Sequence, residues 1–331
     1  MTSTLNVYSL HVNMRVRMKM TETKVTKAMK ATRYKVELTA LYLDEIWIVE
    51  PKLDGMRMHA YISANNTVII KSYADKVMGY WKGVFEDSII KFVRKGLRIS
   101  GAYVLDGEVK LRNGTFQETM SAKAEDADKS DLVYWVFDHM PMKAWKAKRY
   151  DELQISRTLQ LAEAKSALKR LHRGKCIGNV DVLPYSECKP NALQRSFEFA
   201  LKAGHEGIVA KRHDLTYEWK RSKAWLKMKA LHTYDGQIVA IHEGEGKFLG
   251  TAGSITVEGT IDNEHATAFT TNVNLSTDEV RAYFWKNRKK LLKRKVWVEI
   301  QAQEPSYKRS RGNGKVAALR GSKYVKLRED K

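Results

Sequence analysis

Apolar residues gather in short runs along the first part of the chain, which is the pattern of strands. The first strong run covers residues 46–50 and leads directly into Lys52. Two more runs follow at residues 57–62 and 67–71, each after a polar turn. Runs of this length, bounded by turn residues, are typical of strands. The pattern predicts an antiparallel meander with Lys52 at the end of its first strand.

Further along, the pattern predicts two more strands and then two helices. Residues 103–105 form a short apolar run that leads into Asp106, Gly107 and Glu108, and residues 132–138 form a run typical of a buried central strand. Two later segments carry apolar residues at helical spacing, which indicates core-facing helices. These residues are Leu161, Ala164, Leu168 and Leu171 in the first helix, and Leu193, Phe197 and Leu201 in the second.

The pattern changes after about residue 230, where strands alternate with glycine-rich turns. Strands are predicted there at residues 237–241, 254–257 and 296–300. One helix interrupts them, opened by the capping pair Ser276 and Glu279. Several short strands and one helix within about 100 residues are typical of a small closed barrel of the OB type. A small sandwich would show the same pattern.

Length and composition agree with a globular chain of two domains. Of its 331 residues, 43% are hydrophobic and 29% are charged. We expect one domain at residues 1–230, including a basic amino-terminal segment, and a second at residues 231–331. No run of about 18 apolar residues and no secretory pattern is present. Cys176 and Cys188 lack the paired spacing of a zinc site. The cytoplasm is the expected location.

The net charge of +21, from 59 basic and 38 acidic residues, concerns the partners of the chain more than its fold. Polymers rich in phosphate are favoured partners, because each phosphate that a protein neutralises releases a condensed counterion. An anionic membrane is the alternative, but it favours charge concentrated on one amphipathic helix. Here basic runs occur from end to end, at residues 1–40, 165–175 and 286–295. The sequence therefore favours nucleic acid.

Lys52 begins the hexapeptide Lys-Leu-Asp-Gly-Met-Arg at residues 52–57, which suits nucleotide chemistry. A lysine is ordinarily a protonated, solvated charge, and it becomes a nucleophile only where burial or neighbouring cations favour the neutral amine. Gly55 lets the backbone approach a ligand closely, and Arg57 can bind phosphate or ribose oxygens. The alternative is a plain hairpin, because Asp-Gly is also a common turn.

Two acids and two lysines elsewhere are suited to the same phosphate chemistry. Glu108 and Glu206 each lie beside a glycine in a predicted turn, where a carboxylate is well placed to hold magnesium. Lys227 and Lys229 alternate on one strand face and suit a triphosphate. The alternatives are solvated turn acids and an edge strand that carries lysines against aggregation.

Together these residues resemble an ATP-dependent DNA ligase of the small bacteriophage type, within the covalent nucleotidyltransferase superfamily. The resemblance runs from about Glu50 to Lys331 and consists of six matches in the family's order. The matching segments are residues 52–57, residues 106–108, Phe137 with Asp138, residues 206–211, Arg221 with residues 225–229, and residues 325–331.

The resemblance implies a role for each matching residue. Lys52 is the residue that becomes adenylated, Glu50 helps to read adenine, and Phe137 stacks on the purine. Glu108 faces ribose or metal, and Glu206 holds metal. The other residues implied in nucleotide binding are Pro51, Leu53, Arg57, Arg221, Lys227, Lys229, Arg328 and Lys331, of which the last two orient the leaving pyrophosphate.

The resemblance also implies the fold, the cofactors and the partner. The fold class is α+β, with a nucleotidyltransferase domain built on antiparallel sheets with flanking helices, followed by an OB-fold β-barrel domain. ATP and Mg²⁺ are the cofactors. The partner is nicked double-stranded DNA, sealed through a lysyl-AMP intermediate and then a DNA-adenylate. A monomer suffices, no protein partner or membrane is expected, and the location is the cytoplasm, that of a host if the chain is encoded by a phage.

One departure and three alternatives accompany the resemblance. Tyr73 stands where ligases usually carry an arginine near the nucleotide, so that contact is in question. An RNA ligase and a GTP-dependent mRNA capping guanylyltransferase share the lysine chemistry, and a non-catalytic nucleic-acid clamp is the alternative from another class. The motif at residues 225–229 and the compact length favour a DNA ligase, and a clamp has no need of Lys52, Glu108 and Glu206.

Overall fold

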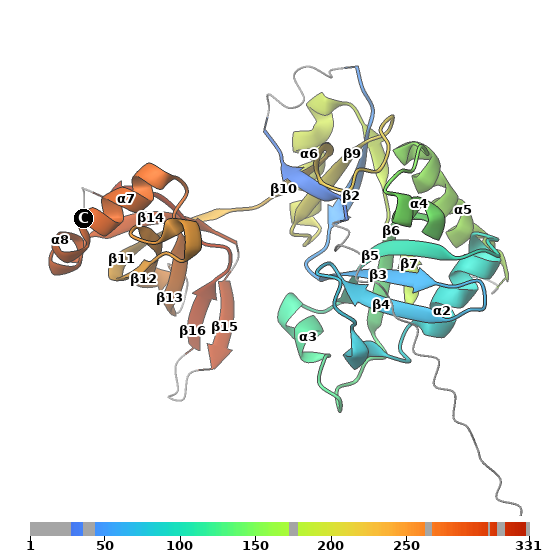
Figure 1. The fold of residues 1–331 in the computed structure, drawn as a ribbon, viewed down its shortest axis with the longest axis horizontal. Coiled ribbons are helices and arrows are strands. Elements are labelled where there is room, and N and C mark those ends of the chain that lie inside the picture. Colours follow the sequence, from blue (N-terminus) through green and yellow to red (C-terminus); the bar gives the residue numbers. More distant parts are fainter. Residues whose placement is uncertain are drawn as a thin grey trace, which may run out of the picture.

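The computed structural model describes residues 28–35, 44–171, 178–261, 267–303, 305–309 and 315–328. Three sheets carry this part of the chain. Figure 1 shows two of the sheets with their helices grouped together, and the third, coloured orange and red, beside them. The segment between β10 (Arg221–Lys229) and β11 (His232–Glu243) connects the two groups.

The first sheet has five strands in the order β1-β10-β9-β2-β8. Besides β10, they are β1 (Lys30–Arg33), β2 (Trp47–Lys52), β8 (Ser186–Cys188) and β9 (Gly207–Arg212). The central three are antiparallel, with Gly207 opposite Lys52 on one side and opposite Lys229 on the other. This register places the ends of β2, β9 and β10, with the predicted site residues Lys52 and Lys229, side by side.

The second sheet has the order β4-β3-β5-β6-β7. Its strands are β3 (Met56–Ile62), β4 (Val68–Ser72), β5 (Tyr103–Leu111), β6 (Leu132–Pro141) and β7 (Val180–Val182). The strands predicted at residues 57–62, 67–71 and 132–138 are thereby confirmed. The strand predicted at residues 103–105 continues to Leu111, so Glu108 lies within a strand, opposite Arg57, and not in a turn.

Two expectations about the sheets are wrong. The first is the meander, because β2 pairs with β8 and β9 while β3 lies in the other sheet. Residues 47–50 are all buried, as in a strand whose sheet is covered on both faces, and not alternately buried as in a meander with one solvated face. The second is the antiparallel order, because β1 pairs with β10 and β6 pairs with β7 in parallel. Helices between β6 and β7 supply the long crossover that a parallel pair requires.

Helices cover these two sheets. The first group comprises η1 (Gly79–Trp81), α2 (Glu86–Lys91), η2 (Phe92–Gly96), α3 (Phe116–Ser121), α4 (Met142–Ala147), α5 (Gln154–Leu171), η3 (Pro190–Ala192) and α6 (Leu193–Lys202). Both predicted helices are confirmed, although Leu171, which was predicted to face the core, is 63% exposed. The α5 residues Leu161, Ala164 and Leu168 join the core of the second sheet, whereas α6 packs through Leu193 and Ala200 onto the first.

The carboxyl-terminal strands form a third sheet in the order β12-β11-β14-β17-β13-β16-β15, with an additional pairing of β12 and β13. Its remaining elements are η4 (Gly246–Phe248), β12 (Ala252–Ile261), β13 (Thr267–Asn274), α7 (Asp278–Lys286), α8 (Arg288–Lys293), β14 (Trp297–Ala302), β15 (Pro305–Arg309), β16 (Lys315–Leu319) and β17 (Lys323–Arg328). One residue pair, Asn274 with Lys323, joins β13 to β17. A closed OB barrel is therefore not established, and it stays a prediction.

The helix predicted within this sheet is present, but its start and its extent differ from the prediction. The hydroxyl of Thr277, not that of Ser276, accepts the amide N–H of Val280 at the first turn of α7. Sequence alone does not separate the two, because both residues can cap. At Asn287 the helix breaks, and α8 begins at the next residue.

A buried ion pair joins β6 to α5. Arg157 on α5 donates two hydrogen bonds to Asp138, of 2.7 and 3.1 Å, and both side chains are fully buried. Arg157 also donates to Gln154. Because Asp138 directly follows Phe137, this pair holds the strand that presents the Phe137 ring.

We predict that Arg157→Ala lowers the free energy of unfolding by about 3–5 kcal/mol, because it leaves the Asp138 carboxylate buried without its partner. Urea unfolding measures this change. Arg149→Ala is the matched control, since Arg149 pairs with Asp151 on the surface and its loss should cost less than about 1 kcal/mol. Equal losses in the two variants would contradict the structural role of the buried pair.

Candidate functional site

A pocket of about 140 Å³ lies between the first and second sheets. Most of the residues predicted around Lys52 line it. The lining residues are Ala31, Glu50, Pro51, Lys52, Leu53, Arg57, Glu108, Phe137, Leu183, Val209, Lys211, Trp225 and Lys227. Side chains alternate across a strand, so Glu50 with Lys52 on β2 and Trp225 with Lys227 on β10 point to the same face. The sheet thereby forms one wall of the pocket.

Gly207 sets the geometry around Lys52. A Cβ at this position would lie 2.1 Å from the carbonyl oxygen of Met228, so only glycine lets the strands meet here. Glu206, directly before it, contacts the Lys52 amine through one carboxylate oxygen. The Lys229 ammonium lies 4.0 Å from the other oxygen. The predicted turn acid and one of the two predicted lysines therefore gather at Lys52.

Gly55 brings the Lys52 loop onto β5. A Cβ on Gly55 would lie 2.4 Å from the carbonyl oxygen of Val109 and 2.9 Å from the Glu108 side chain. Burial raises the pKa of Glu108 to about 7, although Lys52, Arg57 and the backbone of Gly55 stabilise its charged form. This close approach places the Glu108 carboxyl group against the loop that carries the lysine.

Glu50 forms a buried ion pair with Lys211 on β9, which is the last residue of the matching segment 206–211. The Lys211 ammonium donates to Glu50 at 2.8 Å and to the carbonyl oxygen of Phe137 at 2.9 Å. Both side chains are almost fully buried. Burial raises the pKa of Glu50 to about 7, against the opposing effect of Lys211. The pair ties the first sheet to β6 of the second at the inner end of the pocket.

The ring of Phe137 lines the pocket because β6 bulges at that residue. The neighbours of Phe137 in β6, Val136 and Asp138, pair with the consecutive residues Gly107 and Asp106, so Phe137 is the extra residue. A bulge redirects a side chain in this way. The Lys211 ammonium lies 4.8 Å from the centre of the ring. The structure thus places the predicted aromatic residue in the pocket.

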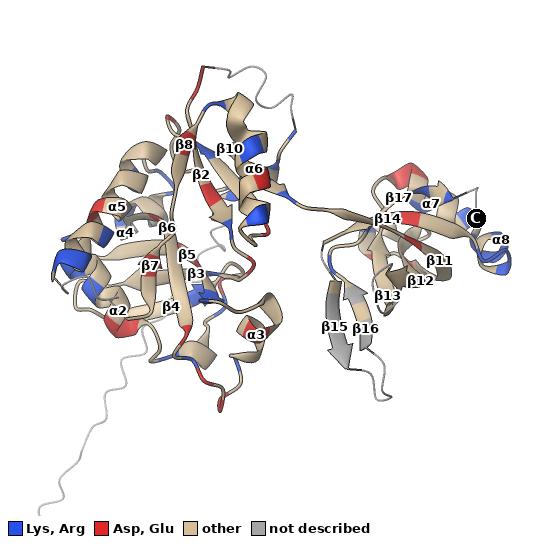
Figure 2. Ribbon diagram, turned by 180° about the vertical axis from the view of Figure 1, so that it is seen from behind, with Lys and Arg blue, Asp and Glu red and all other residues tan. Residues whose placement is uncertain are grey.

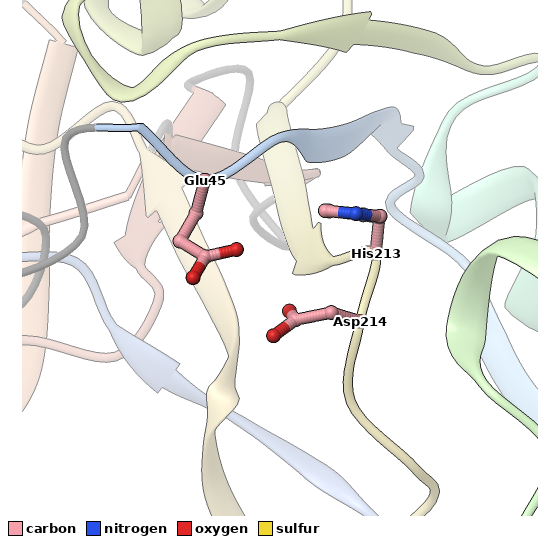
Figure 3. Close-up of side chains that lie close together, drawn as sticks. All are labelled: Glu45, His213 and Asp214. Carbon is pink, nitrogen blue, oxygen red and sulfur yellow. The ribbon is translucent and has the colours of Figure 1, made fainter.

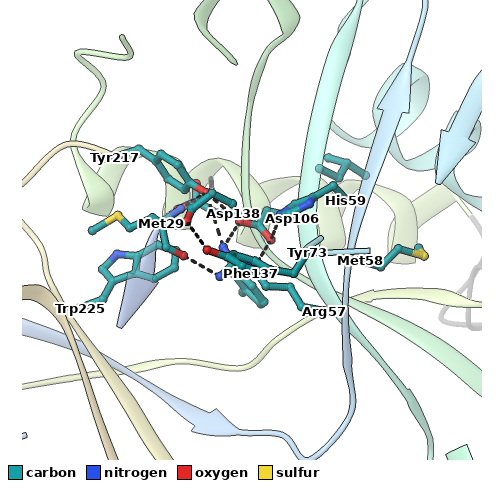
Figure 4. Close-up of polar contacts among 12 residues, drawn as sticks. Met29, Arg57, Met58, His59, Tyr73, Asp106, Phe137, Asp138, Tyr217 and Trp225 are labelled. Atoms are coloured by element: carbon teal, nitrogen blue, oxygen red, sulfur yellow. Dashed lines mark hydrogen bonds and ion pairs between the residues drawn. The ribbon is translucent and has the colours of Figure 1, made fainter. Parts of the chain in front are cut away.

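Arg57 lines the pocket and also joins three segments behind it (Figure 4). Its guanidinium donates two hydrogen bonds to Asp106, at 2.9 and 2.6 Å, and one to the carbonyl oxygen of Met29 at 2.6 Å. Burial alone would raise the pKa of Asp106, but Arg57 and His59 hold it well below its ordinary value. Arg57 is thus committed to protein partners, and its predicted contact with phosphate or ribose stays a prediction.

Tyr73, the departure from the ligase pattern, lies behind Arg57. The guanidinium of Arg57 is 5.5 Å from the centre of its ring, and the Lys30 ammonium is 3.9 Å from it. Its hydroxyl is 3.5 Å from the carbonyl oxygen of Ala28. Tyr73 therefore packs against the segment that leads into β1 and does not line the pocket.

The two predicted lysines of β10 are partly withdrawn from water. Burial lowers the pKa of Lys227, and the neighbouring cations Arg221, Lys52 and Lys229 lower it further. Burial also lowers the pKa of Lys229, with Glu206 opposing and Lys52 adding to the effect. A group of cations that disfavour one another's charge is suited to bind a polyanion such as a triphosphate.

Two residues in loops of the carboxyl-terminal sheet reach this site, and the sequence analysis predicted neither. Gln303 donates from its side-chain amide to Glu206, on the oxygen that Lys52 does not contact. Arg320 donates two hydrogen bonds to Asp54, at 3.2 and 2.6 Å. These contacts place the carboxyl-terminal sheet on the two loops that flank Lys52.

Four residues predicted for nucleotide binding are not among those that line the pocket, and one of them, Lys229, lies near Glu206 instead. Arg221 lies on the exposed side of β10 and donates to the carbonyl oxygen of Ala31 at 2.8 Å. Arg328 on β17 pairs with Asp235 at 2.6 Å. Lys331 lies outside the described residues. The nucleotide contacts implied for these four, like those implied for the residues that line the pocket, stay predictions.

Another group of donor residues lies at the opposite end of β2 and β9. Glu45, His213 and Asp214 bring their ligand atoms within 4.8 Å of one another (Figure 3). The guanidinium of Arg212 pairs with Asp214 and lies 3.4 Å from Glu45. Because an arginine already supplies the positive charge between the two carboxylates, we assign no metal to this group.

Lys211 and Trp225 also belong to the site, although the sequence predicted no role for either. The alternation of side chains along a strand could have pointed to Lys211. Lys211 lies two residues after Val209, which is opposite Glu50, so both Lys211 and Glu50 lie on the same face of the sheet. Trp225 shares the face of Lys227, and its ring centre lies 4.5 Å from the Lys211 ammonium. For Gln303 and Arg320 no local pattern in the sequence points to the site.

Comparison with known proteins shows which family carries this site. Residues 28–229 match the family described as ATP dependent DNA ligase domain, and the chain belongs to this family. A protein named Probable DNA ligase from Mycobacterium sp. (strain KMS) is 42% identical over 211 residues, which cover 63% of this chain and 38% of that protein. Another Probable DNA ligase, from Nocardioides sp. (strain ATCC BAA-499 / JS614), is 28% identical over 222 residues. The chain spans about 38% of the length of these curated relatives.

Solved structures show the same arrangement of the chain. The structure titled Pmar-Lig_PreS3 matches with a TM-score of 0.74 and 25% identity, covering 92% of this chain and 68% of that one. The ATP-dependent DNA ligase from bacteriophage T7, solved in complex with ATP, matches with a TM-score of 0.54 and 16% identity, covering 92% and 99%. The second likeness concerns the fold alone. None of the helices in the described ranges is long and apolar enough to be a membrane span.

The raised pKa of Glu50 predicts a stability that depends on pH. Its pKa is about 7 in the folded protein against an ordinary value of 4.5, so folding favours the protonated form. The stability from this group is complete below pH 4.5 and is lost as the pH rises to 7. We expect the wild type to lose about 1–3 kcal/mol more than Glu50→Gln between pH 5 and 7.5. Urea unfolding at both pH values tests this, and parallel pH profiles would contradict it.

Proposed function

We propose that the chain is an ATP-dependent DNA ligase, which seals a nick between a 5′-phosphate and a 3′-hydroxyl in duplex DNA. The observation that carries the proposal is the Lys52 amine, which lines the pocket, contacts Glu206 and lies near the partly buried Lys227 and Lys229. Membership of the ligase domain family supports it. Because the chain covers only part of its curated relatives, the activity is proposed on the geometry of this pocket.

In the first step Lys52 attacks the α-phosphate of ATP. The bond from Nζ to phosphorus forms, the bond to pyrophosphate breaks, and lysyl-AMP results. Glu206, in contact with Nζ, is placed to accept the proton that the amine loses. Lys227 and Lys229 are placed to stabilise negative charge on the phosphates. Lysines that are partly buried do this better than solvated ones, since water screens them less.

The pocket offers recognition for the base at its inner end. Glu50 and Lys211 present fixed polar atoms there, and Phe137 and Trp225 present aromatic rings. We propose that the purine lies against Phe137 and that Glu50 with Lys211 reads its edge. Pro51 and Leu53 complete the wall beside Lys52.

Glu108 and Glu206 fit a magnesium ion, since carboxylate oxygens are the ligands that this ion prefers and both groups lie beside the Lys52 loop. When bound, magnesium would neutralise charge on the phosphate oxygens. Arg57 acts differently, because its contacts with Asp106 and Met29 hold the pocket wall in place.

The second and third steps join the DNA. AMP passes from Lys52 to the 5′-phosphate at the nick, which restores the amine and gives that phosphate a good leaving group. The 3′-hydroxyl then attacks the phosphate, AMP departs, and the new phosphodiester bond completes the strand. The net charge of +21 supports a polyanionic substrate, and lysines and arginines occur over both parts of the molecule (Figure 2).

We also propose two domains, with residues 231–331 forming an OB fold. One hydrophobic core is composed only of residues between Ile238 and Leu319, which supports a separate unit. Pairings link β11, β12, β13, β17 and β14 in a cycle, although the link between β13 and β17 consists of one residue pair. Through Gln303 and Arg320 this unit would close over Lys52. A monomer in the cytoplasm suffices for the reaction.

The first test is covalent labelling with ATP or GTP that carries label in the α-phosphate, in the presence of magnesium. We expect label from ATP alone, stable to denaturation, and none in Lys52→Ala. Pyrophosphate treatment beforehand removes AMP already carried by the protein. The labelled protein should then seal a nicked duplex. Label from GTP alone would instead indicate a capping guanylyltransferase, and no label from either nucleotide would overturn the proposal.

We predict that Glu206→Gln lowers the rate of self-adenylation by about 10²–10⁴, since the amide cannot accept the proton from Lys52. Single-turnover labelling measures the rate. Glu187→Gln is the matched control, because Glu187 is an exposed glutamate on β8 at the sheet edge. If both variants adenylate at the wild-type rate, Glu206 has no role in the step.

A further inference from the structure

A strongly basic surface occupies the helical insertion of the carboxyl-terminal sheet. Residues 286–295 contain seven lysines and arginines and no acidic residue. Six of the seven are exposed, and we name them the α8 patch. Its members are Lys286, Lys289, Lys290, Lys293, Arg294 and Lys295. Figure 2 shows this basic segment at the end of the carboxyl-terminal part that lies away from the first two sheets.

The seventh cation, Arg288, packs against the protein, whereas the other six are exposed. Arg288 turns inward, with its guanidinium 4.2 Å from the centre of the Trp285 ring and donating to the Trp285 carbonyl oxygen at 2.7 Å. Leu291 and Phe284 are buried in the core of the third sheet. The patch is therefore held on a packed helix pair, and its charges face outward together.

No acidic side chain in the described part of the chain pairs with the α8 patch. None of its six members forms an ion pair there, whereas Lys326 on neighbouring β17 pairs with Glu299. The acids of α7, Asp278 and Glu279, lie at the opposite end of that helix. A surface that only keeps a protein in solution usually mixes both signs of charge. The α8 patch does not.

The placement of these charges costs stability in the free protein. Lys289 and Lys293 are like charges four residues apart in α8, and such a pair costs about 0.2–0.5 kcal/mol in a helix. The first turn of α8 carries cations, where the helix dipole disfavours them. The helix dipoles favour Lys286 in the last turn of α7 and Lys290, Lys293 and Arg294 at the end of α8, so these four have an intrahelical explanation. Lys289, in the first turn of α8, has no such explanation.

We propose that the α8 patch binds the phosphate backbone of duplex DNA as an accessory contact, separate from the nick at Lys52. The partner follows from the proposed function, but the contact is tested by binding alone. Consecutive phosphates along a duplex match a row of exposed lysines, without a requirement for sequence. A membrane would need a broad apolar face beside the charges, and within the described helices α7 and α8 the exposed large apolar side chains are Tyr283 and Leu292.

The test compares two triple variants of the full chain. The first, Lys289→Gln, Lys290→Gln and Lys293→Gln, removes half of the patch. The matched control, Lys82→Gln, Lys91→Gln and Lys95→Gln, removes the same charge from exposed positions near α2. Thermal unfolding of each variant shows whether the fold is kept. Each protein is titrated with a duplex of about 40 base pairs, long enough to extend well beyond one site at 3.4 Å per base pair.

The measured quantity is the slope of log affinity against log salt concentration. Each phosphate contact contributes about 0.9 to this slope, so we expect the α8 variant to lower its magnitude by about 2–3 and the control to leave it unchanged. Equal slopes in the wild type and the α8 variant overturn the proposal, as does the same change in the control. Binding of the patch to phosphatidylserine vesicles with an unchanged DNA slope would assign it to a membrane instead. Covalent labelling of the wild type by ATP tests the ligase assignment independently. If the wild type is labelled but the slopes are equal, the α8 proposal alone fails.

Discussion

The absence of a side chain at Gly207 is the constraint on which the site depends. At that position β9 has Lys52 opposite on one side and Lys229 on the other, and the carbonyl oxygen of Met228 occupies the space where a Cβ would be. A residue of any other type would push the strands apart. The contact between Glu206 and Lys52 would then be lost, because both lie at the strand ends that this glycine brings together.

Buried polar contacts join the second sheet to the first and to the segment before β1. Arg57 reaches Asp106 within its own sheet and the carbonyl oxygen of Met29 in the segment that leads into β1, and Lys211 reaches Glu50 and the backbone of Phe137. Each of these buried charges has a partner, as low-dielectric surroundings require. The walls of the pocket are thus set by ion pairs that leave the Lys52 end open for a ligand.

The sequence located residues of the site better than it predicted how the strands bring them together. Lys52 and Glu206 were recognisable because glycine neighbours and strand ends mark them locally. Glu108 was recognised as a site residue but placed in a turn, since the short apolar run before it gave no sign that the strand continues. Lys211 and Gln303 were missed as site residues, because their partners lie 161 and 97 residues away and pairing at that separation is decided by the register of the sheets.

The contact between Gln303 and Glu206 links the position of the carboxyl-terminal sheet to the surroundings of Lys52. One carboxylate serves the nucleophilic amine on one side and a donor from the carboxyl-terminal sheet on the other. If that sheet moves away, Glu206 loses an amide donor and Asp54 loses the guanidinium of Arg320 at the same moment. The charge around Lys52 therefore changes with the position of a sheet that contributes no residue to the pocket wall. The position of the carboxyl-terminal sheet and the electrostatic surroundings of the Lys52 amine are therefore coupled.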